Sequence, residues 1–510
     1  MSVETALAQH LERPSGRGHT PADAVTGAAG GAACGDLVRV SLSVDPTDAE
    51  GRIADVGFDA HGCGAAIAAG SAVVELVHGA PLLQAARVSA EDIAEELGGL
   101  SSAKRHAAEL AADALHRALG MAARTQAQLV AVAERSLVAM SGGVDSAVAA
   151  LMTARSGADV VAVTLELWSD PENDGERSCC SAQAVRGARE AAHHLGVAHL
   201  SIDLREEFRA GVVDHWLAGH AAGETPNPCV RCNGNVRLEA MLDLGRRLGS
   251  ETLVTGHYAR IDRDGPLLRV AADPVKDQSY VLCGLAPESL ARMRFPLGDM
   301  HKAQVRELAE SEGLAVARKP DSQDLCFLAG TRLPRFLERH GDIRGSPGSI
   351  VDLQGRALGA HRGSHAYTIG QRHGLGLGGG EPLYVLATDA TANTVTVGSR
   401  EDLLTRTVAV RDVTLRRAGA VVDHVKVRSR GRRVPCRLTR PAGPGCHPCI
   451  EVELGEPIER TAPGQLACLF AGELIVGYGT ITASPAGRAG SGGSGQVSIA
   501  ARVGHTAAAH

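Results

Sequence analysis

The spacing of hydrophobic residues changes along the chain and separates it into three zones. In the first zone, alternating apolar and polar positions in "CGDLVRVSLSVD", from Cys34 onward, predict β-strands, and an Ala/Leu/Glu-rich helical stretch follows that ends near Ala123. A group of strands followed by helices is typical of a small α+β domain. We place this domain at residues 26–125.

Strands and helices alternate in the second zone, which begins at Ser136. Strand-length apolar runs are interleaved with stretches of helical periodicity: "SLVAM", "SAVAALMTARSG", "DVVAVTLEL", "SAQAVRGAREAAHHLG", "AHLSIDL" and "ETLVTGHYA". This alternation predicts an α/β doubly wound parallel sheet. We expect it at residues 136–295, followed by a small central domain at 296–348.

The third zone contains short β-branched runs between turns. The runs "TVTVG", "TVAVRDV", "VKVRS" and "CIEVEL" predict a β-barrel or sandwich, and we expect a C-terminal β-barrel over residues 349–483. The two ends of the chain, 1–25 and 484–510, carry too little apolar surface to offset the entropy of ordering. We predict a disordered leader and a disordered tail.

Composition narrows the cellular setting. The 510 residues contain no run of 18 apolar residues and no apolar segment of signal-peptide type near the start. The sequence therefore predicts no membrane span and a cytoplasmic location. Twelve cysteines are expected to stay reduced there, which favours catalysis or metal binding over structural disulfides.

Positive charge is concentrated in one segment although the whole chain has a net charge of -6. Residues 416–440 contain nine Lys or Arg residues and one acid, Asp423. Such a segment is either a solvated basic face or a surface that contacts a phosphate backbone. Charge alone leaves both interpretations open.

A glycine- and serine-rich loop lies within "VAMSGGVDSAVAALM". A predicted strand ends at Met140, the loop Ser141–Ser146 follows, and a helix begins at once. Glycines allow close approach of the backbone to a phosphate, and the serine hydroxyls and helix N-terminal N–H groups are donors for an anion. The Lys of a Walker A loop is missing, so γ-phosphate transfer is not implied. The alternative is a tight turn with an N-cap serine.

Two cysteines stand close together in "TPNPCVRCN", residues 225–233. They fit half of a zinc site, a dithiol redox pair, a nucleophilic cysteine with a tuning neighbour, or two buried apolar side chains. The prolines favour a fixed loop over a helix interior, because each fixes φ and lacks an N–H.

Six motifs in order give the chain a family resemblance. The loop "SGGVDS" resembles the pyrophosphate loop of the ATP pyrophosphatase superfamily. Together with six further motifs, this loop makes the chain similar to the tRNA-specific 2-thiouridylases, which modify the wobble uridine. The six motifs are, in order, "TPNPCVRCN", "TGHYAR", "KDQSYVL", "KPDSQDLCFL", "YTIGQRHGLGLGG" and "APGQLACLF". The resemblance covers about residues 136–482.

The resemblance implies that ATP, with Mg, adenylates the C2 oxygen of uracil so that it becomes a leaving group. The residues implied to bind ATP are Ala139, Met140, Ser141, Gly142, Gly143, Val144, Asp145, Ser146, Leu165 and Gly256. The residues implied to contact tRNA are His257, Lys276, Asp277, Gln278 and Gln465, to which we add Arg428 and Ser429 of the basic segment.

The resemblance also implies the sulfur chemistry. Cys326 would carry a persulfide, supplied by a cysteine desulfurase or another sulfur donor, and Cys232 would attack or resolve it, leaving a disulfide between the two. Many relatives have aspartate where this chain has Cys229. The alternative is that Cys229, Cys232 and Cys326 ligate a 4Fe-4S cluster whose fourth iron binds sulfide.

A second resemblance concerns the first zone. "ACGDLVRVSLSVD", "GFDAHGCGAAIAAGSAVVELVHG" and "AEDIAEELGGLSSAKRHAAELAADAL" resemble the U-type scaffold for iron-sulfur cluster assembly. Cys34, Asp36, Cys63 and His106 fall on its ligand positions, whereas Ala107 stands where the scaffold has its third cysteine. The remaining set fits zinc or a weakly held iron cluster.

The joining of the two parts suggests delivery. We expect a flexible tether at residues 122–135, which would raise the effective concentration of a donor domain at its acceptor. Sulfur relay or docking of a desulfurase is favoured over cluster assembly because of Ala107. The competing functions are an iron-sulfur or sulfur carrier, and another adenylating synthetase of the same superfamily.

Overall fold

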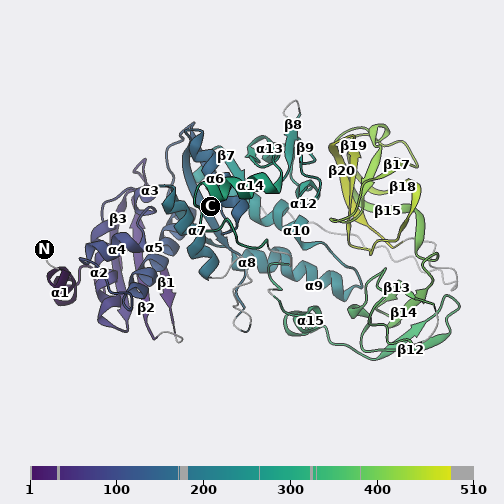
Figure 1. Cartoon of the computed structure of the whole chain (residues 1–510), viewed down its shortest axis with the longest axis horizontal. Coiled ribbons are helices and arrows are strands. Elements are labelled where there is room, and N and C mark those ends of the chain that lie inside the picture. The colour runs from purple at the N-terminus through teal and green to yellow at the C-terminus, as the bar shows by residue number, and fades with distance from the viewer. Residues whose placement is uncertain are drawn as a thin grey trace, which may run out of the picture.

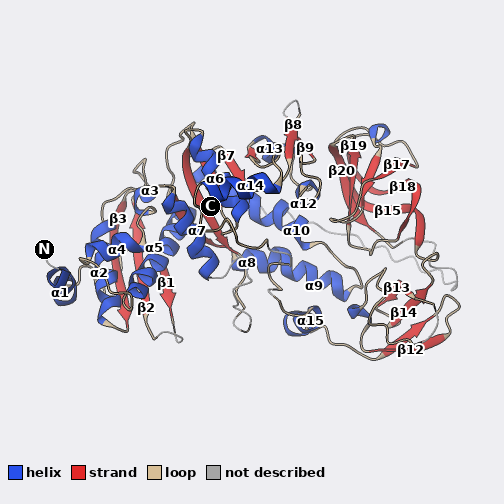
Figure 2. Ribbon diagram, in the orientation of Figure 1, coloured by secondary structure: helices blue, strands red, loops and turns tan. Residues whose placement is uncertain are grey.

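The computed structural model describes residues 3–31, 35–170, 172, 182–262, 265–321, 325–328, 330–378 and 381–483. In Figure 1 the chain runs from an N-terminal α+β domain at the left, through a parallel-sheet domain, to two β domains at the right. Figure 2 shows that strands dominate only the right-hand part. The predicted tail, 484–510, lies outside the described residues. Among the described helices, none has the length and apolar character needed to cross a membrane.

The N-terminal domain is an antiparallel sheet packed against helices. Its strands are β1 (Val25–Gly30), β2 (Leu37–Val44) and β3 (Ile53–His61), in that order. The helices are α2 (Gly64–Val77), α3 (Leu82–Ala85), α4 (Ala90–Glu96) and α5 (Arg105–Thr125), and α2 and α5 contact the sheet. A Cβ at Gly27 of β1 would lie 2.1 Å from the carbonyl oxygen of Ala114, so α5 rests directly on the strand backbone. The predicted α+β domain is confirmed.

The first residues differ from the prediction of a disordered leader. Helix α1 (Val3–Glu12) packs against α2 and buries Ala6 and His10, and Gly18 N–H donates to Phe58 O in β3 at 2.8 Å. The segment has few apolar residues, but Ala6 and His10 are four residues apart and therefore share one helical face. A single buried stripe is enough to order this helix.

The second zone forms a parallel sheet of strand order β10-β7-β4-β5-β6, which confirms the predicted α/β class. Its strands are β4 (Arg135–Ala139), β5 (Asp159–Glu166), β6 (Ala198–Asp203), β7 (Thr252–Thr255) and β10 (Met293–Arg294). Helices α6 (Val144–Arg155), α7 (Ala182–His194) and α11 (Leu238–Arg247) contact the strands, and α14 (Lys302–Ser311) packs on α6. Shorter helical segments are α8 (Arg205–Phe208), η1 (Arg209–Val213), α9 (Asp214–Ala221), α10 (Pro228–Arg231), η2 (Cys232–Arg237), α12 (Ser279–Leu282), α13 (Pro287–Ala291) and α15 (Leu333–Gly341).

The strand order creates a switch point beside β4. The chain proceeds from β4 to β5 and β6 on one side, then returns to β7 and β10 on the other. In such sheets, the loops that leave the carboxyl ends of the two strands at the switch point diverge and open a crevice for a ligand. The loops after β4 and β7 are the two that meet there, and they contain the glycine-rich loop and Gly256.

Helix α5 is shared by two domains. One face covers β1 and β2, and another contacts β6 and α11 of the parallel-sheet domain. A Cβ at Gly120 would lie 1.9 Å from the carbonyl oxygen of Ser201 in β6. Charged contacts close the junction: Arg117 Nε donates to Glu166 Oε1 at 3.0 Å, and Arg189 Nη1 lies 2.8 Å from Asp113 Oδ1. Buried residues of both domains belong to one continuous core.

The prediction of a flexible tether at 122–135 is therefore wrong. Residues up to Thr125 belong to α5, and the rest of the segment is hydrogen-bonded on both sides. Leu129 N–H donates to Arg247 O at 2.8 Å, Val130 N–H to Ala49 O at 3.0 Å, and Val132 N–H to Gly249 O at 2.9 Å. The side-chain pattern did not show these contacts, because they are made by the backbone.

Buried histidines at this junction predict a pH-dependent stability. His116 of α5 lies against His193 of α7 and His199 of β6, with ring centroids 5.4 and 5.9 Å away. Burial lowers the pKa of His193 to about 4 and holds the pKa of His199 well below its usual value, and Arg189 acts in the same direction on both. Burial also lowers the pKa of His116 to about 3, but carbonyl oxygens at both of its ring nitrogens oppose this shift, so the prediction rests on the other two histidines.

Below pH 6.5 the unfolded chain binds more protons at His193 and His199 than the folded chain does, so stability falls as the pH drops from 6.5 toward 4. We expect the free energy of unfolding to decrease by roughly 2–4 kcal/mol between pH 7 and pH 5. Urea titration at the two pH values measures this. The control is His373→Gln, at an exposed histidine, which should leave the change in the free energy of unfolding between pH 7 and pH 5 as it is in the parent. If this change persisted in His193→Gln and His199→Gln, the pH dependence would not come from these two histidines.

The β region contains two bodies where the sequence predicted one barrel. A sheet of order β12-β11-β14-β13 comprises β11 (Gly348–Val351), β12 (Ala357–His361), β13 (Tyr384–Asp389) and β14 (Thr394–Gly398). The barrel comprises β15 (Leu404–Leu415), β16 (His424–Lys426), β17 (Val434–Leu438), β18 (Gly445–Glu459), β19 (Leu466–Ala471) and β20 (Leu474–Ile481), and the pairing of β15 with β20 closes it. Their buried residues form two separate cores, which a strand pattern alone does not reveal.

The parallel-sheet domain also extends into the regions on either side. The hairpin of β8 (Arg260–Asp262) and β9 (Leu267–Arg269) joins the barrel sheet, with Arg269 opposite Leu474. The predicted small central domain at 296–348 does not have a core of its own among the described residues: α14 packs on α6 and α15 packs on α9. The short helices of this segment bury their apolar faces against the parallel-sheet domain instead.

Candidate active site

The loop after β4 has the shape of an anion cradle. Gly142 has φ +68°, a backbone conformation that favours glycine, and a Cβ there would lie 2.6 Å from the carbonyl oxygen of Ala184. Both the backbone conformation and the lack of space therefore require glycine at this position. Ser146 Oγ accepts from Ser141 N–H at 3.1 Å and donates to Gly143 O at 3.0 Å, which curls the loop over the first turn of α6. The predicted loop residues are thus gathered at the start of α6, while ATP binding by them stays a prediction.

Gly256 is brought to the same loop from β7. A Cβ at this position would lie 2.7 Å from the backbone carbon of Asp145 and 2.8 Å from Ser146 N. The end of β7 therefore touches the first turn of α6, as expected at the switch point. Leu165 is buried in β5, the strand next to β4. A bulky residue at 256 would push the loop away from the sheet.

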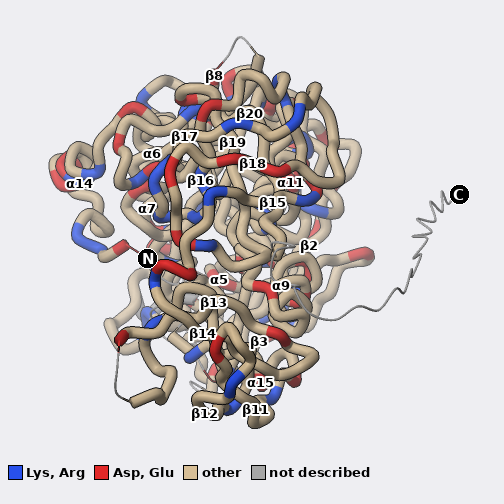
Figure 3. The backbone as a smooth tube through the Cα atoms, turned by 90° about the vertical axis from the view of Figure 1, so that its right-hand side faces the viewer, with Lys and Arg blue, Asp and Glu red and all other residues tan. Residues whose placement is uncertain are grey.

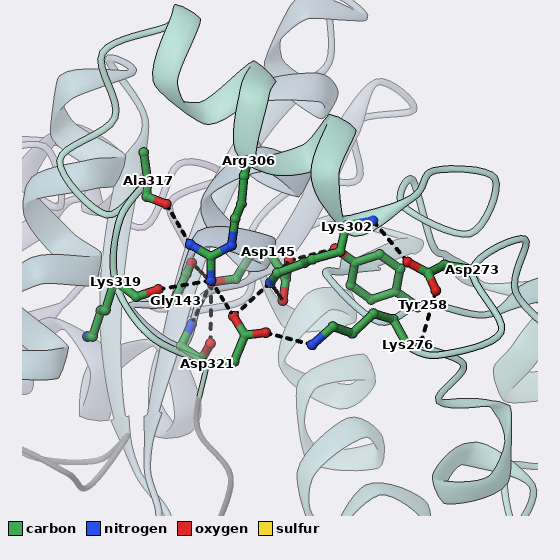
Figure 4. Close-up of polar contacts among 12 residues, drawn as sticks. Gly143, Asp145, Tyr258, Asp273, Lys276, Lys302, Arg306, Ala317, Lys319 and Asp321 are labelled. Carbon is green, nitrogen blue, oxygen red and sulfur yellow. Dashed lines mark hydrogen bonds and ion pairs between the residues drawn. The ribbon is translucent and has the colours of Figure 1, made fainter. Parts of the chain in front are cut away.

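Cationic side chains surround the loop (Figure 4). Lys302 Nζ lies 2.8 Å from both carboxylate oxygens of Asp145 and 2.9 Å from Asp321 Oδ1, and Lys319 Nζ donates to Gly142 O at 2.9 Å. Lys276 and Arg306 also pair with Asp321, at 2.8 and 2.9 Å. Positive charge beside glycine backbone is the arrangement that binds polyphosphate.

The two carboxylates of this network hold the cations in place. Tyr258 O–H donates to Asp145 Oδ1 at 2.8 Å. Partial burial would raise the pKa of Asp321, but hydrogen bonds from Lys276 and Lys302 outweigh it and hold that pKa at about 2. Asp321 is therefore a fixed anion that orients the two lysines.

Several of these residues were missed by the sequence reasoning. Lys319 and Asp321 stand in the "KPDSQDLCFL" motif and Tyr258 in "TGHYAR", but the resemblance assigns roles to other residues of these two motifs. Lys302 and Arg306 lie on α14 outside any recognised motif. The motif order could have drawn attention to the first three, whereas the two on α14 become visible only once this helix is placed beside α6.

Cys229 and Cys232 lie in short helical turns rather than in an extended loop. Asn227 caps α10 by accepting from Cys229 N–H at 3.0 Å, Pro228 takes the first helical position, and η2 begins at Cys232. Cys229 is exposed and Cys232 is half-buried. Surrounding protein atoms raise the pKa of the Cys229 thiol, and Arg237 opposes this shift, so Cys229 favours the neutral thiol.

Arg237 is a further residue that sequence reasoning did not select. It acts on both Cys229 and His257: desolvation, followed by the charge of Arg237, lowers the pKa of His257 to about 3. Its Nε is buried and has no hydrogen-bond partner among the described residues. This buried, positively charged N–H donor is one that an anion at the cysteine side of the site would satisfy.

Cys326 lies in a segment that packs on the same helical unit. It is half-buried, and the next residue, Phe327, packs on Phe208 and Trp216 with ring centroids 6.1 and 5.1 Å apart. Helix α8, which contains Phe208, also contacts η2, which begins at Cys232. Both cysteine segments therefore rest on the α8–η1–α9 unit, and their pairing in catalysis stays a prediction.

The predicted 4Fe-4S ligands do not converge like ligands of a single ion. The sulfur atoms of Cys229, Cys232 and Cys326 are all in described residues, and they do not form a group within 4.8 Å of one another. A four-iron cluster holds each sulfur on a different iron, so it requires a wider spacing than one ion does. The cluster alternative is therefore left as a prediction.

Internal contacts engage most of the residues expected to bind tRNA. Asp277 Oδ2 accepts from Ser279 O–H at 3.0 Å, Gln278 Oε1 accepts from Tyr258 N–H at 2.9 Å, and Gln465 Nε2 donates to Thr225 O at 2.6 Å. These side chains shape the site and tie the barrel to the cysteine segment. The other expected positions are Lys276 and His257, placed above, and Arg428 and Ser429, which are exposed in the turn between β16 and β17.

In the N-terminal domain, three of the four predicted metal ligands are described. Cys63 Sγ lies 3.3 Å from Asp36 Oδ2, and Asp36 Oδ1 accepts from Cys63 N–H at 2.8 Å. His106 Nε2 is buried and lacks a hydrogen-bond partner among the described residues. Cys34 lies outside those residues. A thiol, a carboxylate and an imidazole are ligand types that suit a zinc or iron ion, but the ligand atoms of Asp36, Cys63 and His106 do not lie within 4.8 Å of one another.

Four family models match consecutive segments of the chain. They are described as NifU-like N terminal domain (residues 3–128), tRNA methyl transferase HUP domain (134–330), tRNA methyl transferase PRC-barrel domain (334–399) and Aminomethyltransferase beta-barrel domain (413–481). The boundaries agree with the bodies of the fold, including the separation of the two β domains.

Whole-chain relatives extend this match. The chain is 44% identical over 486 residues to the Bifunctional protein NifU/MnmA of Rubrobacter xylanophilus, covering 93% of this chain and 97% of that protein. It is 41% identical to the tRNA-specific 2-thiouridylase MnmA of Geobacter metallireducens, covering 69% of this chain and 97% of that protein, and 44% identical to that of Frankia alni, covering 69% and 100%. The chain therefore belongs to the family of tRNA-specific 2-thiouridylases, in the form that is fused to a NifU-like domain.

Proposed function

We propose that this enzyme replaces the C2 oxygen of the tRNA wobble uridine by sulfur and uses ATP to activate that oxygen. The observation that carries the proposal is the glycine loop at the switch point, enclosed by Lys276, Lys302, Lys319 and Arg306. A cradle of this kind suits a triphosphate that releases pyrophosphate. The sulfurtransferase relatives supply the reaction class.

In the first step, the uridine C2 oxygen attacks the α-phosphorus of ATP, and the bond to the β-phosphate breaks. Lys302 and Lys319 lie where they neutralise the charge that builds up on pyrophosphate. Magnesium, when bound with ATP, adds further positive charge on the phosphates, and Asp145 is the loop carboxylate that would hold it. The product is an O-adenylated uridine.

In the second step, the outer sulfur of a Cys326 persulfide attacks C2, and AMP leaves with the oxygen. The Cys232 thiolate then attacks Cys326 Sγ, so that the sulfur remains on the uridine as the thiocarbonyl and a Cys232–Cys326 disulfide forms. A dithiol reductant restores both thiols. Placement of both cysteines on the α8–η1–α9 unit supports this route, and the raised pKa of Cys229 makes that thiol less suited to either role.

We further propose that Asp36, Cys63 and His106, with Cys34, hold a zinc or iron ion in the NifU-like domain. The contact of Cys63 Sγ with Asp36 Oδ2 at 3.3 Å supports this, and His106 Nε2, which lacks a partner among the described residues, would have to move toward that pair to join it. Chemically, such an ion would bind sulfide or a desulfurase cysteine. The docked junction at α5 means that delivery cannot depend on a swinging tether.

Nucleoside analysis of tRNA tests the function. The protein is incubated with tRNA, ATP, Mg²⁺ and either sulfide or a desulfurase with cysteine, and the tRNA is digested and analysed for 2-thiouridine. We expect thiolation that requires ATP and releases AMP and pyrophosphate in equal amounts. Release of ADP and phosphate, or modification without ATP, would contradict the adenylation route.

The exposed turn between β16 and β17 predicts a salt-dependent tRNA contact. Figure 3 shows Lys/Arg and Asp/Glu interleaved around β16–β18, and two arginines of the basic segment are already paired: Arg432 with Glu456, and Arg437 with Glu453. Arg428 and Arg430 are exposed in the turn, and the described residues offer them no acidic partner. These two arginines share one turn and have no acidic partner among the described residues, so they can meet phosphate together.

We expect the double variant Arg428→Gln with Arg430→Gln to bind tRNA more weakly. The slope of log affinity against log salt should become shallower by roughly 1–2, because fewer phosphate contacts form and fewer counterions are released on binding. Filter binding over a range of KCl concentrations measures the slope. Arg432→Gln with Arg437→Gln removes the same charge from the same surface and is the matched control. Equal slopes in the two double variants would mean that the turn is only a solvated face.

A further inference from the structure

A group of potential metal ligands lies outside the sites described above. His10, Glu75 and Glu96 each bring one ligand atom to within 4.8 Å of the others. In the part of the chain that the structure describes, this is the one set of three or more His, Cys, Asp or Glu side chains that are close enough to share an ion. The residues come from α1, α2 and α4 of the N-terminal domain.

This group is distinct from the predicted ligands at Asp36 and Cys63. Cys63 caps the N-terminus of α2, whereas Glu75 is in the last turn of that helix. Twelve residues of α-helix separate the two positions by roughly 18 Å. One ion therefore cannot be shared between the two groups.

The imidazole of His10 is held in a ligand-like orientation. The residue is 5% exposed, and its Nδ1 lies 2.9 Å from the hydroxyl of Ser71, which is fully buried. Ser15 N–H donates to the same hydroxyl at 2.9 Å, which fixes it further. When Nδ1 donates to Ser71, Nε2 carries the lone pair, and a hydrogen bond on the far nitrogen is the usual way in which a metal-binding histidine is oriented.

The open nitrogen of His10 faces the two carboxylates. Nε2 lies 4.0 Å from Glu75 Oε2, which is too long for a hydrogen bond and leaves room between them. Glu75 is itself positioned by Ser15, whose Oγ donates to Oε1 at 2.6 Å. Glu96 is the last residue of α4 and is exposed, so its side chain is free to turn inward.

We propose that His10, Glu75 and Glu96 form a divalent-cation site, with zinc as the ion that matches one imidazole, two carboxylates and a water. Tetrahedral zinc with bonds of 2.0–2.2 Å brings its ligand atoms to about 3.3–3.5 Å from one another. The exposed carboxylates reach this spacing by moving roughly 1 Å, while the buried imidazole stays in place. The ion would tie α1 to α2 and α4.

Zinc binding by the full-length protein after chelator treatment tests the site. Equilibrium dialysis at limiting free zinc counts the bound ions, and Co²⁺ spectra distinguish nitrogen and oxygen ligands from thiolates. We expect Glu96→Gln to lose one equivalent of zinc, or to raise its Kd at least about tenfold, without changing the thiolate bands. Glu95→Gln, an exposed neighbour on the same helix, should bind zinc like the parent.

A second readout does not depend on counting ions. Zinc should slow backbone hydrogen exchange in residues 3–12 several-fold in the parent and in Glu95→Gln, but not in Glu96→Gln. His10→Asn should behave like Glu96→Gln, and if it fails to fold, the exposed Glu96→Gln carries the test alone. Equal zinc content and equal exchange in Glu96→Gln and Glu95→Gln would overturn the site.

Discussion

Replacing Asp145 by Asn should reduce the rate of tRNA thiolation by roughly 10²- to 10³-fold, while tRNA affinity changes by less than about twofold. Asp145 accepts from Tyr258 and from Lys302 Nζ, with both carboxylate oxygens 2.8 Å from the ammonium group. The amide keeps the shape but loses the charge that orients Lys302 and would hold the metal of the nucleotide. ATP-dependent pyrophosphate release should fall in parallel with thiolation.

The control for Asp145→Asn is a carboxylate near the opposite end of helix α6. Glu312 pairs with Arg155 at the last turn of α6, so Glu312→Gln also removes a carboxylate from an ion pair with this region. It should thiolate at close to the parental rate. Normal pyrophosphate release with lost thiolation in Asp145→Asn would place this residue in sulfur transfer and refute its assignment to the phosphates.

Replacing Gly120 by Ala should lower the free energy of unfolding by roughly 2–3 kcal/mol, although Gly to Ala in a helix ordinarily raises it by about 1 kcal/mol. The added methyl group would lie 1.9 Å from the carbonyl oxygen of Ser201, so α5 and β6 must separate. Because α5 also covers β1 and β2, the shift strains the cores of two domains at once. Denaturant titration measures the change.

Gly187 on α7 provides the matched control, because Gly to Ala at this helical position should not lower the free energy of unfolding. A Cβ there would meet nothing within 4 Å, so Gly187→Ala should be neutral or stabilise the protein by roughly 0.5–1 kcal/mol. If Gly120→Ala stabilised the protein equally, the close contact between α5 and β6 would be refuted, and with it the shared core.

The parallel sheet was predictable because its strands are buried on both faces and read as continuous apolar runs. Strand β5 is buried along nearly its whole length, and turn signals separate it from its neighbours. The loop at Ser141–Ser146 and Gly256 could be assigned to one site from their motifs, since both follow strands that end at the same edge. Physical contact between them then follows from the strand order.

Other features could not be read from the chain. Lys302 reaches Asp145 from 157 residues away, and nothing local marks it among the lysines of the sequence. Most residues of α5 are buried alanines and leucines, so its apolar positions cover more of the helix than one domain can bury, and the sequence does not reveal the second partner. The backbone hydrogen bonds of residues 126–135 depend on the fold of both domains, so the side-chain pattern of this segment predicts a tether although it is docked.

The shared helix also determines an order of events while the chain is being made. Helix α5 leaves the ribosome with its own domain, but its second face is covered by β6 and α11, and β6, the first of the two, ends about 80 residues later. At 5–20 residues per second, this apolar face stays uncovered for roughly 4–16 s. The nascent N-terminal domain therefore emerges as a folded body with one adhesive surface, and a chaperone that binds apolar helices, or a ribosomal pause before residue 204, would decide whether that surface meets β6 or another nascent chain.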